Sequence, residues 1–188
     1  MTIDYNPRQT LFSLVFAAGL LSLLAPPSPA LAQTAPAAQA VPAAQAATPA
    51  AAEMGLLTAT NWQEFKDSMA GEGYGPDLVK AAIPALQGRM TKDWRAGVAM
   101  TPESIKSIPA GTAIASFAEN GEYTNTAGQS QAALFVAPFM NAEGRVIGMT
   151  VLDQWQKQGM AKTRVLYFDR SRKGSNGAYS YSTIHLPQ

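Results

Sequence analysis

The second half of the chain alternates between apolar and polar positions with the two-residue period of β-strands. Short segments that contain Gly and Asn separate the alternating runs, as is typical of an antiparallel sheet. The residues at 141–144, Asn-Ala-Glu-Gly, are expected to close a hairpin. The pattern predicts five strands, over residues 112–118, 132–139, 145–153, 163–168 and 178–184.

Ahead of these strands, apolar residues recur at the three- and four-residue spacing of amphipathic helices. Trp62, Phe65 and Met69 would share one face of a short first helix. A second helix is expected to begin at Pro76, because proline suits the first helical position, and to be kinked or shortened at Pro84. Between this helix and the strands, residues 90–109 form a loop-rich stretch.

Helices first and strands afterwards predict an α+β domain, with N-terminal helices packed on a roughly five-stranded antiparallel sheet. We assign residues 54–188 to this single domain, because their composition is mixed and differs from that of the preceding segment. A domain of 135 residues can bury a core without disulfides.

The N-terminal segment has the composition of an export signal. One Arg precedes the apolar run at residues 11–24, and Ala-Leu-Ala at residues 30–32 fits the small-x-small cleavage rule. We therefore predict a signal peptide over residues 1–32, cleaved after Ala32, with no stable membrane anchor left after cleavage. Residues 33–53 are almost wholly Ala, Pro, Gln and Thr and are predicted to form a disordered linker. The protein is expected in the periplasm or outside the cell.

The net charge of the chain and its distribution limit the kinds of molecule that it is expected to bind. The formal net charge of +1 argues against a general affinity for nucleic acid. The charge is uneven, because residues 54–156 carry seven Lys/Arg against ten Asp/Glu, whereas residues 157–188 carry six against one. This basic end is either a solvated surface or a weak site for an acidic partner such as a cell-wall polymer.

The chain contains no cysteine and one histidine, His185, which stands three residues from the end. It therefore has no disulfide and no thiol nucleophile. One His without Cys does not make a usual catalytic zinc site, and the sequence lacks the Gly-rich loops that bind phosphates. We expect neither a metal nor a cofactor.

Several segments of the domain together resemble one family. They are Trp-Arg-x-Gly at residues 94–97, Gly-Thr-Ala-Ile-Ala-Ser-Phe at 111–117, Asn-Gly-x-Tyr at 120–123, Gln-Ala-Ala-Leu-Phe at 131–135 and Val-Leu-Asp-Gln-Trp at 151–155. Over roughly residues 73–188 this pattern resembles the small bacterial papain-like cell-wall amidases of the CHAP/NlpC type. The resemblance implies a papain-like order of one helix followed by the sheet.

The same resemblance implies where a catalytic site would lie. In that family a cysteine at a helix N-terminus attacks the carbonyl carbon of the amide bond. A histidine on a strand accepts the proton of the cysteine, and a polar residue orients the histidine ring. Here the resemblance places the nucleophile position at or beside Asp77 and the base position at Gln131. Glutamine does not titrate, so it cannot act as a base. Asp153 is the retained orienting residue. The chain is thus predicted to be a degenerate member without catalytic residues.

Three functional hypotheses remain open from the sequence. The first is an inactive papain-like domain that binds cell-wall peptide or a protein partner through a remnant cleft. The second is a cell-wall hydrolase that uses Asp77 and Asp153 as an acid/base pair. The third is an exported structural or interaction domain unrelated to hydrolases. The candidate cleft residues are Asp77, Trp94, Gln131, Asp153 and Trp155.

Overall fold

The structure of this chain, a computed structural model, describes residues 54–187. The predicted signal peptide over residues 1–32, its cleavage after Ala32 and the predicted linker over residues 33–53 lie outside the described residues. Within the described part of the chain, no helix has the length and apolar character needed to cross a membrane.

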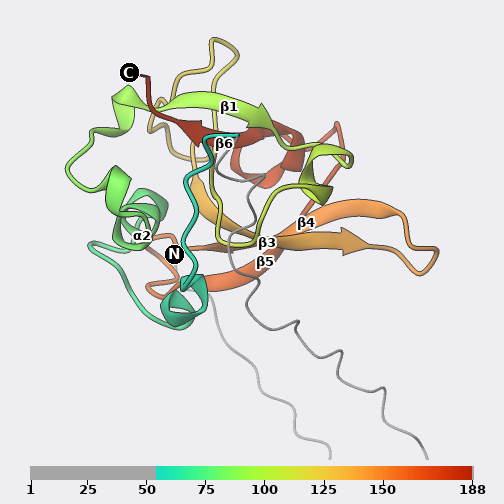
Figure 1. Cartoon of the computed structure of the whole chain (residues 1–188), viewed down its shortest axis with the longest axis horizontal. Helices are drawn as coiled ribbons and strands as arrows, with labels where there is room; N and C mark the ends of the chain where they lie inside the picture. Colours follow the sequence, from blue (N-terminus) through green and yellow to red (C-terminus); the bar gives the residue numbers. More distant parts are fainter. Residues whose placement is uncertain (1–53, 188) are drawn as a thin grey trace, which may run out of the picture. The chain divides into compact units, whose positions relative to one another are not determined.

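One antiparallel sheet of six strands runs through the described residues (Figure 1). Its strands lie in the order β1-β6-β2-β3-β4-β5, and every neighbouring pair is antiparallel. The strands are β1 (Arg95–Ala99), β2 (Ala113–Ser116), β3 (Ala132–Met140), β4 (Val146–Asp153), β5 (Lys162–Tyr167) and β6 (Tyr181–His185). The α+β class and the antiparallel sheet expected from the sequence are confirmed.

The five strands expected from the sequence correspond to β2–β6, but the sheet has a sixth strand. The assignment of residues 90–109 to loops is wrong for β1, which pairs with β6 at the sheet edge. The strand lacks the alternation of a half-buried strand, since its residues are half-buried or exposed, and its register shifts between Ala96 and Ala99. At Val98 the backbone N–H donates to Thr183 Oγ1 (2.9 Å), so a side chain replaces a ladder bond.

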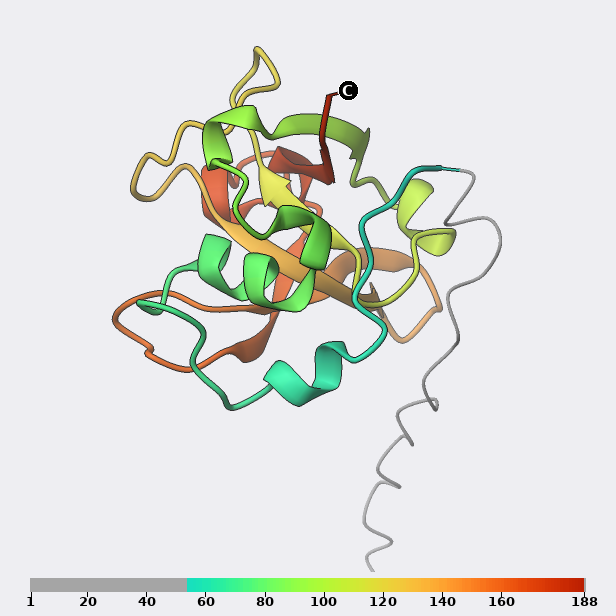
Figure 2. The same cartoon turned by 60° about the vertical axis from the view of Figure 1, so that its left-hand side comes forward.

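One α-helix, α2 (Gly75–Ala82), packs on one face of the sheet (Figure 2). Its residues Leu78 and Val79 are fully buried. The helix begins one residue before the expected Pro76, and Pro84 ends it by opening a short 3-10 helix, η2 (Pro84–Leu86). The sequence-based account of this element is therefore confirmed.

The first predicted helix is wrong. Trp62, Phe65 and Met69 do not share a helical face, because only the four-residue 3-10 helix η1 (Trp62–Phe65) forms, and Met69 is 62% exposed. After η1 the backbone forms hydrogen bonds with Ala161, which directly precedes β5, and not with the next helical turn. Asp67 N–H donates to Ala161 O (2.9 Å), and Ala161 N–H donates to Ser68 O (2.7 Å). Tertiary hydrogen bonds thus override the helical pattern. The sequence predicted more than one N-terminal helix, but the described residues before β1 contain one α-helix, α2, and short 3-10 helices.

Buried apolar clusters lie on both faces of the sheet. Successive side chains of one strand point to opposite faces, so a single strand contributes to both clusters. In β3, Leu134 belongs to the apolar cluster under α2, whereas its neighbour Phe135 belongs to the cluster on the other face. That second cluster is covered by the segment that contains the 3-10 helix η4 (Ser104–Lys106), through Met100, Ile105 and Ile108. The central strands β2–β4 are therefore held from both sides.

Candidate functional site

Three elements meet at one end of the sheet: the N-terminus of α2, the start of β3 and the end of β4. Gly75 is the first residue of α2, and a Cβ placed on it would lie 2.9 Å from Nε2 of Gln131. Gln131 directly precedes β3, and Asp153 ends β4 opposite Ala133. The register of β3 and β4 therefore brings the two polar positions together beneath the helix end.

Gln131 is fixed by hydrogen bonds in two directions. Its backbone N–H donates to Ser116 Oγ (2.8 Å), which anchors it to β2. Its side-chain Nε2 donates to the carbonyl oxygen of Gln154 (2.9 Å). The amide also lies near Asp153, whose Oδ1 has no hydrogen-bond partner within the usual geometry among the described residues.

Gln154 positions the segment that leads into α2, and the sequence reasoning missed it. The side chain is fully buried. Its Oε1 accepts from Ala70 N–H (2.9 Å), while its Nε2 donates to the carbonyl oxygens of Ala70 (2.7 Å) and Tyr74 (3.3 Å). One amide thus clamps the residues on both sides of the glycine-containing turn at 71–73. Its place in the Val-Leu-Asp-Gln-Trp segment, next to Asp153, is the only sequence signal for this role.

Asp153 forms a buried ion pair with Arg164 of β5. The Arg164 Nε donates to Asp153 Oδ2 at 2.6 Å, with the carboxylate side chain fully buried and the arginine side chain 22% exposed. Burial raises the pKa of Asp153, and the Arg164 charge opposes this shift. In the β4–β5 register of the structure, Arg164 lies diagonally across from Asp153 on the same face of the sheet.

Arg164 is itself held in a fixed orientation. Its Nη2 donates to the carbonyl oxygen of Ser175 (2.9 Å), which also accepts from the hydroxyl of the buried Tyr181 (3.0 Å). The guanidinium lies over the ring of Trp155, 4.9 Å from its centroid. Trp155 is 37% exposed, so one side of this stack faces solvent.

A hollow of about 260 Å³ opens beside this stack. Amide, hydroxyl, guanidinium and indole groups line it, so it offers both hydrogen-bonding groups and an aromatic surface. The lining residues are Gly128, Ser130, Gln131, Trp155, Arg164, Ser175 and Asn176. We call it the Trp155 hollow. Of the five candidate cleft residues, Gln131 and Trp155 line it, and Asp153 lies behind it through Arg164.

Asp77 is in the first turn of α2, but its side chain faces away from Gln131. The Oδ2 atom accepts from the backbone N–H groups of Glu72 (2.9 Å) and Tyr74 (3.3 Å). Gly71 has a φ of +52°, and a Cβ there would lie 2.7 Å from the Asp77 carboxyl carbon. Asp77 therefore caps the turn before the helix and does not line the Trp155 hollow.

Trp94 also lies apart from the hollow. It is fully buried in the apolar cluster under α2, where its ring packs against Tyr123 with 5.3 Å between centroids. Its neighbour on the helix is Lys80, whose Nζ lies 5.9 Å from the ring centroid. The structure gives Trp94 the contacts of a core residue.

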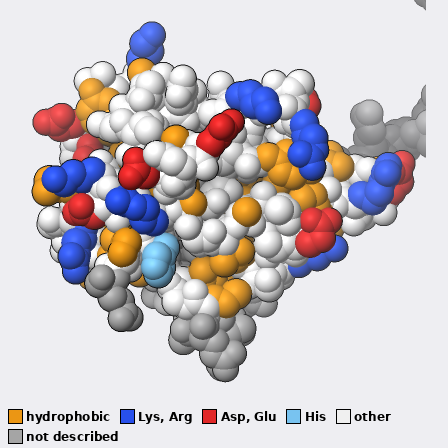
Figure 3. Space-filling model, turned by 90° about the horizontal axis from the view of Figure 1, so that it is seen from above, with side chains coloured by type: hydrophobic (Ala, Val, Ile, Leu, Met, Phe, Trp, Pro, Cys, Tyr) orange, Lys and Arg blue, Asp and Glu red, His pale blue; other side chains and the backbone are white. Residues whose placement is uncertain are grey.

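The single histidine lies away from this site. His185 ends β6, pairs with Arg95 on the edge strand β1 and is exposed. It is the one pale-blue side chain in Figure 3, on a face where acidic and basic side chains are interspersed. Over residues 54–187, no three His, Cys, Asp or Glu side chains gather so that they could hold a metal ion.

Comparison with known proteins identifies the family. The model of the family described as domesticated amidase effector 2 (Dae2) matches residues 58–184. The chain belongs to the Dae2 family. A search of curated proteins gave no match. Among solved structures, the type 6 secretion amidase effector 2 (Tae2) is similar in fold, with a TM-score of 0.56 and 23% sequence identity over 70% of this chain and 95% of that chain.

Membership in the Dae2 family confirms the resemblance to cell-wall amidases. At the meeting point of α2, β3 and β4, this Dae2-family domain has Gly75, Gln131 and Asp153. Glycine has no side chain, and an amide neither attacks a carbonyl nor titrates. Among these three residues only Asp153 is ionisable, and Arg164 occupies one of its oxygens.

The buried ion pair leads to a pH-dependent prediction. In Arg164→Gln, Asp153 loses its counter-charge, and we expect the free energy of unfolding at pH 7 to fall by about 3–5 kcal/mol. The pKa of Asp153 in the folded state would rise further, so the folded variant binds a proton that the unfolded chain has already released. Its deficit relative to the parent should therefore shrink as the pH falls from 7 to 4, measured by urea denaturation.

Arg170→Gln is the matched control, because Arg170 is exposed and stacks only on Tyr179. Its effect should stay within about 0.5 kcal/mol. An Arg164→Gln deficit that is equally large at pH 7 and pH 4 would contradict the assigned ion pair.

The close contact of Gly75 leads to a second prediction. A Cβ at this position would overlap the backbone carbonyl oxygen of Ala132, and no side-chain rotation relieves an overlap with backbone. We expect Gly75→Ala to lower the free energy of unfolding by about 1–3 kcal/mol. Ala81→Ser, at an exposed position of the same helix, should cost only about 0.5 kcal/mol. Equal stability of Gly75→Ala and the parent would show that the helix end has room for a side chain.

Proposed function

We propose that this Dae2-family chain is an exported, catalytically inactive amidase domain that binds cell-wall peptide through the Trp155 hollow. The observation that carries the proposal is the closeness of Gly75 to Gln131, since a Cβ at position 75 would lie 2.9 Å from Gln131 Nε2. Papain-like amidases have a cysteine at a helix N-terminus opposite a strand histidine. Gly75 therefore corresponds to the nucleophile better than Asp77, whose carboxylate is turned toward the preceding turn.

The loss of catalysis in this proposal has a chemical and a steric cause. Amide cleavage through a covalent intermediate needs a nucleophile and a base within hydrogen-bond reach. The whole chain has no cysteine, and Gln131 stands at the base position. The backbone of Ala132 also lies where a nucleophile's Cβ would be. Restoring a side chain at position 75 would therefore require β3 to move.

The proposal of retained binding rests on the groups that remain. The indole of Trp155 offers a half-exposed aromatic surface, and Arg164 rigidifies it from one side. Ser130 and Asn176 add polar groups that can bond to peptide N–H and C=O groups. A rigid aromatic side chain beside a few placed polar groups is typical of ligand sites.

The observations weigh against a hydrolase that uses Asp77 and Asp153. A pair of catalytic carboxylates must flank the bond to be cleaved. Asp77 is engaged by two backbone N–H groups, and Asp153 is fully buried against Arg164. Neither residue lines the Trp155 hollow. The export signal over residues 1–32 belongs to the proposal, because it would bring the domain to the cell wall.

Cosedimentation with purified cell-wall sacculi tests the proposal. The parent chain should sediment with sacculi, and Trp155→Ala should weaken this binding about tenfold or more, because a stacked aromatic residue at the centre of a site carries much of its affinity. Met140→Ala is the control: Met140 is 52% exposed but ends β3, away from the hollow. Failure of the parent to sediment with sacculi, or equal binding by Trp155→Ala, would refute binding through this hollow and would favour a protein partner.

A further inference from the structure

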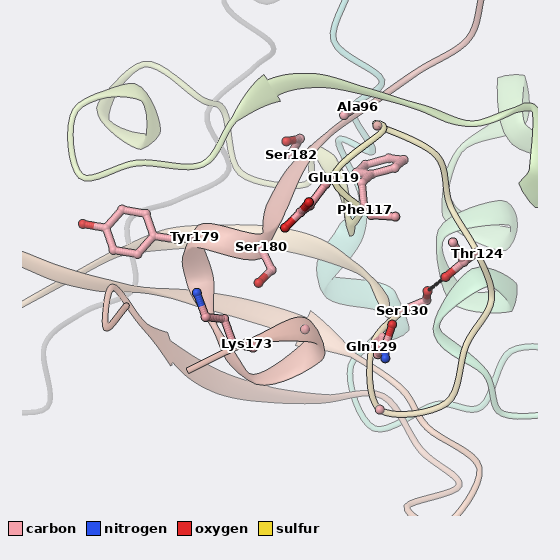
Figure 4. A pocket seen from close by; sticks show the side chains of 14 residues that line it. Ala96, Phe117, Glu119, Thr124, Gln129, Ser130, Lys173, Tyr179, Ser180 and Ser182 are labelled. Carbon is pink, nitrogen blue, oxygen red and sulfur yellow. Dashed lines mark hydrogen bonds between the residues drawn. The ribbon is translucent and has the colours of Figure 1, made fainter. Parts of the chain in front are cut away.

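A second and larger hollow adjoins the Trp155 hollow. Its volume is about 760 Å³, within the range of small-ligand sites. One wall is formed by the segment around Phe117–Ser130 and the other by residues 173–182. Gly128 and Ser130 line both hollows, so the two lie side by side. Figure 4 shows the larger one, which we call the Glu119 hollow.

The two walls are braced against each other. Ser175 on one wall donates from its Oγ (3.1 Å) and from its backbone N–H (3.4 Å) to the carbonyl oxygen of Gly128 on the other. A Cβ on Gly174 would lie 2.7 Å from the same oxygen, so only glycine allows this approach. Thr124 and Ser130 are joined by a hydroxyl–hydroxyl bond of 2.7 Å, which closes the first wall on itself (Figure 4). The hollow is therefore formed before a ligand enters.

Two opposite charges line this hollow without neutralising each other. Glu119 comes from one wall and Lys173 from the other, and both are exposed. Neither takes part in an ion pair among residues 54–187. Their neighbours along the chain do so: Glu122 pairs with Arg95, and Arg172 pairs with Asp169. In Figure 4 the side chains of Glu119 and Lys173 flank Ser180.

A ligand with one ammonium and one carboxylate group complements this arrangement. Glu119 would accept hydrogen bonds from the ammonium, and Lys173 would donate to the carboxylate. The hydroxyls of Ser180 and Ser182 also line the hollow and can bond to either group. A ligand that carried only one of the charges would leave the other protein charge uncompensated.

We propose that the Glu119 hollow binds the zwitterionic end of a peptide, where an ammonium and a carboxylate are attached to the same carbon, while the adjoining peptide lies in the Trp155 hollow. This inference rests on the proposed function and specifies its ligand. A diamino acid with a free amino-carboxylate end is the chemical group that fits. Specificity then comes from Lys173, which distinguishes such an end from a plain amine.

Calorimetry with two synthetic peptides tests this inference on the full chain. The probes are L-Ala-γ-D-Glu-meso-diaminopimelate, which has the zwitterionic end, and L-Ala-γ-D-Glu-L-Lys, which lacks its carboxylate. The parent should bind the first about fivefold or more tightly than the second, because a hydrogen bond to a charged group is lost in the second. Lys173→Met should remove this preference by weakening the first peptide alone. Glu119→Gln should weaken both peptides.

Glu103→Gln and Lys106→Met provide matched controls, because these charges are exposed and do not line the hollow. They should leave both affinities unchanged. Equal affinity of the parent for the two peptides, absence of binding to either, or unaltered binding by Lys173→Met would overturn the inference. Loss of sacculus binding in Trp155→Ala would in those cases still support the proposed function, so the two failures are distinguishable.

Discussion

The N-terminus of α2 lies against the start of β3 so closely that the first helical residue has no space for a side chain. A Cβ at Gly75 would overlap the backbone carbonyl oxygen of Ala132. The buried amide of Gln154 ties the residues before α2 to the end of β4. In an amidase the same junction would hold the attacking atom and its base. Here it holds closely packed backbone and amide groups.

The ion pair of Asp153 and Arg164 supports the exposed surface beside the junction. Asp153 is buried and would be unfavourable alone, but it holds Arg164, which in turn supports the exposed ring of Trp155. Arg164 also bonds to Ser175, whose other contacts to Gly128 brace the two walls of the larger hollow. One buried carboxylate therefore orients groups in both hollows. In the inactive domain that we propose, this connection would give Asp153 a structural role.

Much of the fold could be predicted from the sequence, where local pattern and tertiary packing agree. The strands β3 and β4 are almost wholly apolar, as expected for strands that contribute to buried clusters on both faces of the sheet. The edge strand β1 escaped prediction, since Gly97 and the bond from Val98 to a threonine side chain interrupt the ladder. The helix expected at Trp62 failed because its continuation bonds to Ala161 instead.

The site could be predicted only in part. Gln131 and Asp153 lie within strand motifs, so their positions followed from the resemblance. The corresponding helix position was placed beside an ionisable residue, Asp77, because a glycine carries no chemical signal; only the contact with Gln131 identifies Gly75. Two tryptophans looked equivalent in the sequence, but Trp94 is core and Trp155 faces solvent. Such differences depend on burial in the folded domain, which cannot be predicted from the neighbouring residues in the sequence.

The central claim is that the domain binds cell-wall peptide through the Trp155 hollow without cleaving it. Mass analysis of the fragments released from purified sacculi during incubation with the parent chain tests it most directly. The account predicts no released peptide above the sample without protein, while the chain itself is recovered with the sacculi. Release of peptides with newly formed amide-cleavage ends, abolished in Asp153→Asn, would contradict it.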